Sequence, residues 1–260
     1  MASVDTMIPG IGKFEEAFAD DAGLYIVIGG AARELIYAEA GVWENTATKD
    51  LDVVLIAEAV DAAFAAKFLH FVREAGYSHV TKTGDNQLYR FSNPTDISHP
   101  QQIELLSRRP DYLQDAEAVI GKIPIDDSEY SLSAILLDDD YYGLLSSGAA
   151  VTHKYRIPTL AHEYLPVFKM RAYDDLSAKA AAGERIRKGE IGKHRRDIFR
   201  LVSLLSGNVA IDLPKAVQDE IETFLDTVTL PSPDYMKSLG LGRITFDEMK
   251  EAIRAVYLPS

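Results

Sequence analysis

The amino-acid sequence predicts an α+β protein with two parts: a mixed sheet covered by helices in residues 1–155, and helices alone in residues 156–260. In the first part, short β-rich apolar runs alternate with segments of helical periodicity, whereas only the helical pattern recurs from about Pro158. The chain has 260 residues, 47% of them hydrophobic. That composition suffices for one domain of about 150 residues and a smaller companion.

The first part is expected to begin with an amphipathic helix and then to alternate strands and helices. Ile11, Phe14 and Phe18 give the opening segment one apolar face. The run that follows it is β-rich and bounded by glycines, which is typical of a buried strand. The expected elements are a strand over 24–28, a helix over 31–40, a strand over 50–56, a helix over 60–75, and short strands over 78–83, 87–91 and 101–106.

Residues 122–157 show the least regular pattern. Ile123 to Ile125 and Leu132 to Leu137 are candidate edge strands. The triplet Asp138-Asp139-Asp140 is expected to form an exposed turn, and we do not assign it to a metal.

The second part is expected to contain helices only. Pro158 can open the first of them, and Pro166 either kinks that helix or marks its true start, because proline fits best in a first turn. The later helices are expected over 191–206, 213–226 and 245–257.

The overall composition excludes several classes of protein. The chain contains no cysteine, so disulfides, thiolate metal sites and a cysteine nucleophile are excluded. No apolar run approaches the roughly 18 residues of a membrane span, so no membrane partner and a cytoplasmic location are expected. The formal net charge of -13 argues against a broad surface that coats nucleic acid.

Two acidic residues in the strand over 50–56 are candidate metal ligands. Asp50 and Asp52 lie two apart, so both carboxylates project from one face of the strand while Leu51 and Val53 face the core. Two like charges this close repel each other unless a cation lies between them, and Mg²⁺ or Mn²⁺ is the natural occupant. The alternative is a strand end that carries two solvated acids.

A glycine pair lies upstream of these acids, between the strand over 24–28 and the following helix. Gly29 and Gly30 allow backbone amides to approach a ligand closely, and a helix N-terminus favours an anion such as phosphate. A Gly-Gly pair is also a common tight turn, and the known phosphate-loop patterns are absent from the sequence.

Together these residues resemble the nucleotidyltransferase superfamily related to DNA polymerase beta. The resemblance rests on Ile28-Gly29-Gly30 and Asp50-Leu51-Asp52-Val53, with a third acid in Gln102-Ile103-Glu104-Leu105-Leu106. It implies a nucleotidyltransferase-type mixed sheet, a nucleoside triphosphate (NTP) as substrate, and a Mg²⁺ or Mn²⁺ site formed by Asp50, Asp52 and Glu104. It further implies that Gly29 and Gly30 hold the phosphates.

Two segments of the second part are similar to the helical motifs of the AbiEii-type toxin nucleotidyltransferases. They are Leu165 to Ala172, which contains Lys169, and Lys193 to Leu201, which contains Asp197. This resemblance implies that Lys169 and Lys193 reach the triphosphate, that Asp197 completes or orients the site, and that an antitoxin encoded nearby is a partner. The alternative for Lys193 and Asp197 is an i,i+4 ion pair on a solvated helix.

The sequence departs from this family in three places. Nineteen residues separate Gly30 from Asp50, so residues 41–49 are expected to form an extra turn. Ala31 stands where toxin relatives often have a hydroxyl residue. In the last motif, Arg196-Asp197 replaces a Lys-Asp start and the lysine is displaced to position 193.

The expected reaction is metal-dependent transfer of a nucleoside monophosphate (NMP) from an NTP to an acceptor hydroxyl. The acceptor expected from the toxin relatives is tRNA or another cellular target. A basic cluster in residues 185–200 can guide RNA, and its alternative is a solvated helix surface. Two alternative functions are a small-molecule nucleotidyltransferase of the antibiotic type and a nucleotide-binding module without turnover.

Overall fold

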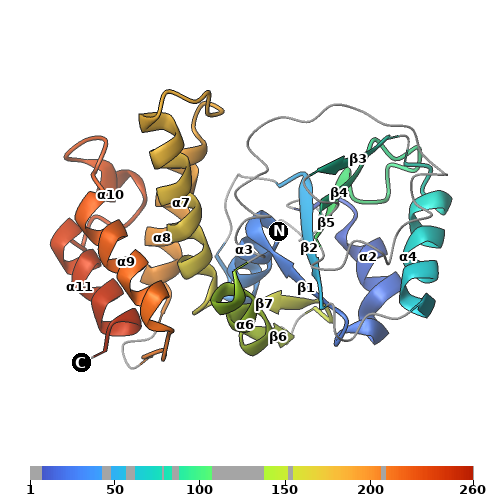
Figure 1. The fold of residues 1–260 in the computed structure, drawn as a ribbon, viewed down its shortest axis with the longest axis horizontal. Coiled ribbons are helices and arrows are strands. Elements are labelled where there is room, and N and C mark those ends of the chain that lie inside the picture. The colour runs from blue at the N-terminus through green and yellow to red at the C-terminus, as the bar shows by residue number, and fades with distance from the viewer. Residues whose placement is uncertain are drawn as a thin grey trace. The chain divides into compact units, whose positions relative to one another are not determined.

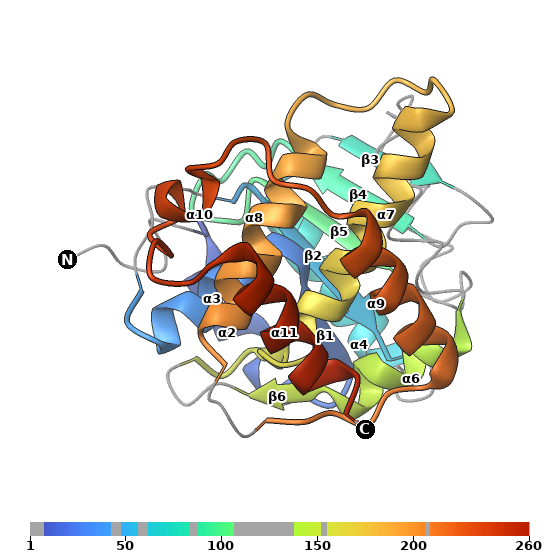
Figure 2. The same cartoon turned by 90° about the vertical axis from the view of Figure 1, so that its left-hand side faces the viewer.

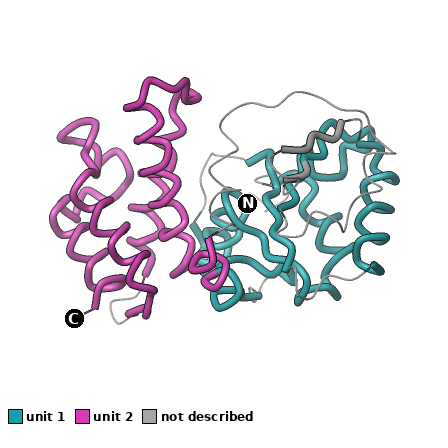
Figure 3. The backbone as a smooth tube through the Cα atoms, in the orientation of Figure 1, with its two compact units in different colours: residues 1–137, 145–161 teal, residues 138–144, 162–260 magenta. Residues whose placement is uncertain are grey.

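The structure is a computed structural model that describes residues 8–42, 48–56, 62–77, 79–83, 88–106, 138–151, 155–205 and 209–259; of residues 79–83 and 88–89 it describes the backbone alone. The chain forms two compact units (Figure 3). Unit 1 comprises Met1–Leu137 and Leu145–Ala161, and unit 2 comprises Asp138–Leu144 and His162–Ser260. The predicted α+β class is confirmed. The domain boundary predicted from the sequence lies between residues 155 and 156, whereas unit 2 also takes in Asp138–Leu144.

Unit 1 contains a mixed sheet with the strand order β3-β4-β5-β2-β1-β7-β6 (Figure 1). Its strands are β1 (Tyr25–Ile28), β2 (Asp50–Leu55), β3 (His79–Thr83), β4 (Leu88–Ser92), β5 (Gln102–Leu106), β6 (Ala149–Val151) and β7 (Pro158–Leu160). The pairs β2–β5 and β1–β7 are parallel, and the other neighbours are antiparallel. The strands predicted between residues 24 and 106 are therefore confirmed.

Two helices cover one face of this sheet through aromatic packing. The helices of unit 1 are α2 (Ile11–Phe18), the 3-10 turn η1 (Ala19–Asp21), α3 (Gly29–Glu39) and α4 (Ala62–Glu74). Phe18 of α2 lies 5.9 Å from Phe68 of α4, and Phe68 lies 5.4 Å from Phe91 of β4, ring centroid to centroid. Leu51 and Val53 of β2 are fully buried. Because side chains alternate along a strand, Asp50 and Asp52 point to the other face.

Unit 2 is built from helices (Figure 2). Their buried side chains form a shared apolar core. The helices are α6 (Asp139–Ser147) as far as Leu144, α7 (Leu165–Ala181), α8 (Glu190–Ser203), α9 (Lys215–Thr227), α10 (Tyr235–Ser238) and α11 (Phe246–Tyr257). Helix α7 packs against α8 and α9, and α11 packs against the same two helices. The core includes the buried side chains of Phe199, Phe224 and Ile253.

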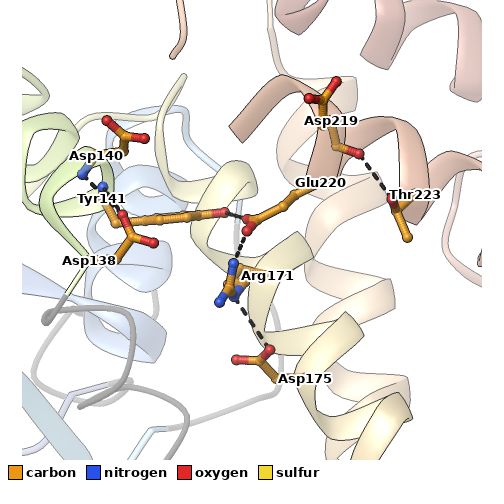
Figure 4. A network of polar contacts seen from close by, with 8 residues as sticks. All are labelled: Asp138, Asp140, Tyr141, Arg171, Asp175, Asp219, Glu220 and Thr223. Atoms are coloured by element: carbon orange, nitrogen blue, oxygen red, sulfur yellow. Dashed lines mark hydrogen bonds and ion pairs between the residues drawn. The ribbon is translucent and has the colours of Figure 1, made fainter. Parts of the chain in front are cut away.

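A polar network ties the start of α6 to α7 and α9 (Figure 4). The guanidinium of Arg171 forms ion pairs with Glu220 and, at 3.3 Å, with Asp175 Oδ1. The Tyr141 hydroxyl donates to Glu220 Oε2 at 2.6 Å. These contacts explain why Asp138–Leu144 belongs to unit 2 although the residues after it belong to unit 1.

The acidic triplet at 138–140 is not the exposed turn that the sequence analysis predicted. Asp138 Oδ1 accepts hydrogen bonds from the backbone N–H groups of Asp140 and Tyr141, at 3.0 and 3.4 Å, as α6 begins. Carboxylates are favoured at this position because the first N–H groups of a helix lack intrahelical partners. The triplet therefore starts a helix. The candidate edge strands at 123–125 and 132–137 lie outside the described residues.

Of the predictions made for Pro158 and Pro166, one is wrong and one is confirmed. Pro158 does not open a helix: it is the first residue of β7, whose Thr159 pairs with Val27 of β1. Because proline has no N–H to donate to the ladder, it is confined within sheets to positions such as the first residue of a strand. Pro166 lies in the first turn of α7, which was one of the two predicted alternatives.

Candidate active site

Polar side chains on the face of the sheet opposite α2 and α4 lie in register across three strands. Asp50 and Asp52 of β2 pair with Gln102 and Glu104 of β5, respectively, and Glu104 pairs with Arg90 of β4. Residues directly opposite each other in neighbouring strands point to the same face. The row Asp52, Glu104, Arg90 therefore crosses one face of the sheet, and we call this the acidic face.

The glycine turn lies against this face. Gly29 is the first residue of α3 and has φ 66°, and a Cβ atom placed on it would overlap Asp52 Oδ2 and lie 3.0 Å from Asp52 Cγ. A Cβ on Gly30 would lie 2.9 Å from the Thr48 hydroxyl oxygen. Position 29 thus has room for glycine only, and the structure brings Gly29, Gly30 and Asp52 together as the motif order predicted.

The chemistry of Asp50 and Asp52 suits a hard divalent cation. Both side chains are half-buried and offer carboxylate oxygens on one face. Within the described ranges, no group of three or more His, Cys, Asp or Glu residues is placed to hold a metal ion. The predicted metal site rests on the two carboxylates of Asp50 and Asp52. That number is sufficient for Mg²⁺, which is commonly bound by one or two carboxylates together with water and substrate phosphates.

Glu104 lies beside Asp52 but is engaged by two other side chains. Its Oε1 accepts hydrogen bonds from Arg90 Nη2 at 2.6 Å, from Arg90 Nε at 3.1 Å and from Gln102 Nε2 at 2.8 Å. The side chains of Arg90 and Glu104 are only 21% and 11% exposed, so this ion pair is largely shielded from water. Glu104, the predicted third metal ligand, therefore lies in the row between Asp52 and Arg90. Its side chain forms an ion pair with the guanidinium of Arg90.

Sequence reasoning did not single out Arg90 or Gln102. The signal for Arg90 was the alternation of polar and apolar residues along β4, where Arg90 and Ser92 flank the buried Phe91. That alternation identifies a face, but it does not identify the cross-strand neighbour. Thr48 was also missed, although it places a hydroxyl beside Gly30.

Lys169 and Asp197 form a buried ion pair within unit 2. Lys169 Nζ of α7 lies 2.9 Å from Asp197 Oδ2 of α8, and their side chains are 5% and 1% exposed. Arg196 Nε lies 3.5 Å from the other oxygen of Asp197. Asp197 thus holds Lys169 in place, and both the role of Asp197 in a nucleotide site and contact of Lys169 with a triphosphate stay predictions.

Lys193 has a more open environment than Lys169. Its side chain is 42% exposed and its Nζ lies 4.0 Å from Glu190 Oε2. The next residue, His194, has its pKa lowered to about 3 by burial and by the nearby charge of Lys169. His194 is therefore neutral at physiological pH.

The basic cluster of residues 185–200 divides into two parts. In α8, Arg195 donates to the Thr229 carbonyl at 2.8 Å and Arg200 donates to the Leu239 carbonyl at 3.4 Å, so these charges help to join elements of unit 2. In the loop before α8, three basic side chains are exposed: Arg185, Arg187 and Lys188. These three loop residues, together with the part-exposed Lys193, are members of the cluster that are accessible for the predicted contact with RNA.

The fold and the acidic face define an α+β protein with paired carboxylates beside a glycine turn at a helix N-terminus. Comparisons with known protein families, with curated proteins and with solved structures found no match. Among the described helices, none combines the length and the apolar character needed to cross a bilayer.

Proposed function

We propose that this chain is a metal-dependent nucleotidyltransferase that moves an NMP from an NTP to an acceptor hydroxyl and releases pyrophosphate. One observation carries the proposal. The Asp52 carboxylate lies against Gly29 at the N-terminus of α3, with Asp50 on the same face of β2. A cation-binding pair of acids and an anion-binding helix terminus therefore meet at one point, as the substrate of this reaction requires.

Asp50 and Asp52 hold the divalent ion in this proposal. Their two negative charges are close enough to repel each other, and a bound cation relieves that repulsion. Mg²⁺ or Mn²⁺ there supplies positive charge that neutralises the triphosphate and lowers the pKa of the acceptor hydroxyl. The resemblance also assigns Glu104 to this site, as a further ligand or as the group that accepts the hydroxyl proton, but its hydrogen bonds to Arg90 and Gln102 favour a role outside the metal site.

The start of α3 holds the phosphates. The first N–H groups of a helix have no intrahelical acceptor and attract anions, and glycine at positions 29 and 30 allows an oxygen to come close to them. The resemblance assigns Lys169 and Lys193 to neutralising the charge that moves onto pyrophosphate, with Lys169 oriented by Asp197. The 2.9 Å hydrogen bond from Lys169 Nζ to Asp197 Oδ2 supports the role of Asp197 in orienting Lys169.

The acceptor in this proposal is an RNA such as tRNA, and the protein acts as the toxin of a toxin-antitoxin pair. The exposed loop with Arg185, Arg187 and Lys188 supports an RNA acceptor, because basic side chains bind phosphate backbones. A small cationic acceptor is the second candidate, and the net charge of -13 favours it.

The test is incubation with labelled NTPs and Mg²⁺ in the presence of total tRNA, of aminoglycosides, or of neither. Label on tRNA supports the RNA-directed enzyme, and label on the aminoglycoside supports the second candidate. Stabilisation by NTP and Mg²⁺ without transfer to any acceptor supports a binding module instead. Label transfer by Asp52→Ala at the wild-type rate would show that the acidic face is not the active site.

A further inference from the structure

Arg90 lies on the acidic face, in the same row as Asp52 and Glu104. The row runs from β2 through β5 to β4, which are neighbours in the sheet (Figure 1). Neighbouring strands are spaced at about 4.8 Å, so the Cα atoms of Asp52 and Arg90 are about 10 Å apart. An extended arginine side chain covers much of that distance, which puts a guanidinium within reach of a nucleotide held by Asp52.

The hydrogen bonds of Glu104 point to a role different from metal binding. Its Oε1 already accepts three N–H groups, two from Arg90 and one from Gln102. Carboxylate–guanidinium bonds of this kind are charge-assisted and roughly twice as strong as neutral ones. To bind an ion through Oε1, Glu104 would have to give up these bonds.

We propose that Glu104 holds Arg90 as an anion-binding group for the phosphates of the nucleotide, and that Glu104 is not the third metal ligand. This inference rests on the proposed function, because it assumes a nucleotide on the acidic face. Arginine suits the task, since its planar guanidinium stays charged and binds phosphate oxygens through parallel N–H groups. Glu104 is then a positioning residue, and Asp50 and Asp52 are the metal ligands.

The first arm of the test is a Mn²⁺ titration of the full chain without nucleotide, followed by electron paramagnetic resonance. It compares the wild type, Asp52→Asn and the double variant Arg90→Gln/Glu104→Gln. The double variant keeps the net charge, and two amides can hydrogen-bond across the strands. We expect it to keep its Mn²⁺ affinity within about twofold, whereas Asp52→Asn loses about tenfold or more, because it removes a charged ligand.

The second arm is calorimetric titration with an NTP, once with Mg²⁺ and once with a chelator. Arg90→Gln and the double variant are expected to bind the nucleotide about tenfold or more weakly in both conditions, since each loses a charge-assisted contact to phosphate. Arg90→Lys keeps the charge, is expected to lose less, and replaces Arg90→Gln if that variant does not fold.

A matched control removes another ion pair from unit 1. Lys67 Nζ of α4 lies 2.5 Å from Asp21 Oδ2 of η1, away from the acidic face. The variant Lys67→Gln/Asp21→Asn also loses one positive and one negative charge. We expect its affinity for Mn²⁺ and its affinity for the NTP to stay at the wild-type value. Thermal melts of all variants show which of them are folded.

Each pattern of results decides the question. If the double variant loses Mn²⁺ as severely as Asp52→Asn, Glu104 is a ligand and the inference is overturned, while the proposed function stands. If the double variant binds both Mn²⁺ and the NTP as the wild type does, Arg90 and Glu104 form only a cross-strand contact, and the inference is again overturned. A wild type that binds no Mn²⁺ refutes the proposed metal site, and the titration with chelator still decides the role of Arg90. A wild type that binds no nucleotide in either condition overturns both.

Discussion

Gly29 and Gly41 stand at the two ends of α3 and allow the geometry of the glycine turn to be tested against a matched control. Both have a left-handed backbone, with φ 66° at Gly29 and 70° at Gly41. They differ in their surroundings. A Cβ on Gly41 meets nothing within 4 Å, whereas a Cβ on Gly29 overlaps the Asp52 carboxylate.

The backbone cost is the same in Gly29→Ala and Gly41→Ala. Placing a non-glycine residue in the left-handed region costs about 1–2 kcal/mol. In a domain of this size, each kcal/mol lowers the melting temperature by about 2–4 °C, so Gly41→Ala should lower it by about 2–8 °C.

The additional effect of Gly29→Ala comes from Asp52. The new Cβ would lie 3.0 Å from Asp52 Cγ and closer still to Oδ2, so the carboxylate must move. Relief of such an overlap needs a shift of about 1 Å. A misplacement of that size at a reacting centre costs on the order of 100-fold in rate. We therefore expect Gly29→Ala to lose about 100-fold in NMP transfer, and Gly41→Ala to stay near the wild-type rate.

The assay is NMP transfer at a temperature at which thermal melts show both variants fully folded. Equal losses of activity in Gly29→Ala and Gly41→Ala would refute the reasoning, because the backbone cost alone would then explain them. Wild-type activity in Gly29→Ala would refute it as well, since the position of Asp52 would not matter.

Three further predictions concern unit 2. Lys169→Met leaves the buried Asp197 carboxylate without its ammonium partner, so the free energy of unfolding should fall by about 3 kcal/mol; denaturant melts in a double-mutant cycle with Asp197→Asn check this, and a coupling energy near zero would contradict it. Burial raises the pKa of Asp174 to about 6 from its ordinary value of 3.8, so the folded state binds that proton more tightly and stability falls as pH rises through this window. With allowance for solvent screening, Asp174→Asn should be about 1 kcal/mol more stable than the wild type at pH 7 but not at pH 3.5. Urea melts at the two pH values test this, and an equal difference in stability at both would count against it. Thr245 caps α11 through a capping box, and Thr245→Ala should cost about 1 kcal/mol in the same melts, with an unchanged midpoint as the contrary result.

Local patterns predicted much of unit 1. The alternation of Leu51 and Val53 with Asp50 and Asp52 identified both the buried and the polar face of β2, because that alternation is a property of the strand itself. The glycines at 29 and 30 marked the turn between β1 and α3 in the same way. Each of these signals lies within one element and its flanks.

Features that depend on pairing between distant segments could not be predicted. Strand β7 is only three residues long, and its parallel partner β1 is more than a hundred residues earlier in the chain, so Pro158 was interpreted as a helix start. The bond between Arg90 and Glu104 likewise depends on the register of β4 against β5. Register follows from the packing of a whole sheet, and no single segment encodes it.

The start of α6 was missed for a related reason. Three consecutive acids have the composition of a solvated turn, and their use at a helix N-terminus is apparent only once the helix is placed. Tyr141 anchors that helix by a hydrogen bond to Glu220, which lies far along the chain in α9.

The central claim is that Asp50 and Asp52 form the metal site of a nucleotidyl transfer. Its most direct test follows the fate of label on the α-phosphate and on the γ-phosphate of the same NTP, with Mg²⁺ and tRNA or an aminoglycoside. The control variant is Asp20→Ala, which removes an exposed acid of unit 1. We predict that the wild type and Asp20→Ala attach the α-label to an acceptor and release the γ-label in pyrophosphate, and that Asp52→Ala does neither. Release of the γ-label as inorganic phosphate, or α-label transfer by Asp52→Ala at the wild-type rate, would contradict the claim.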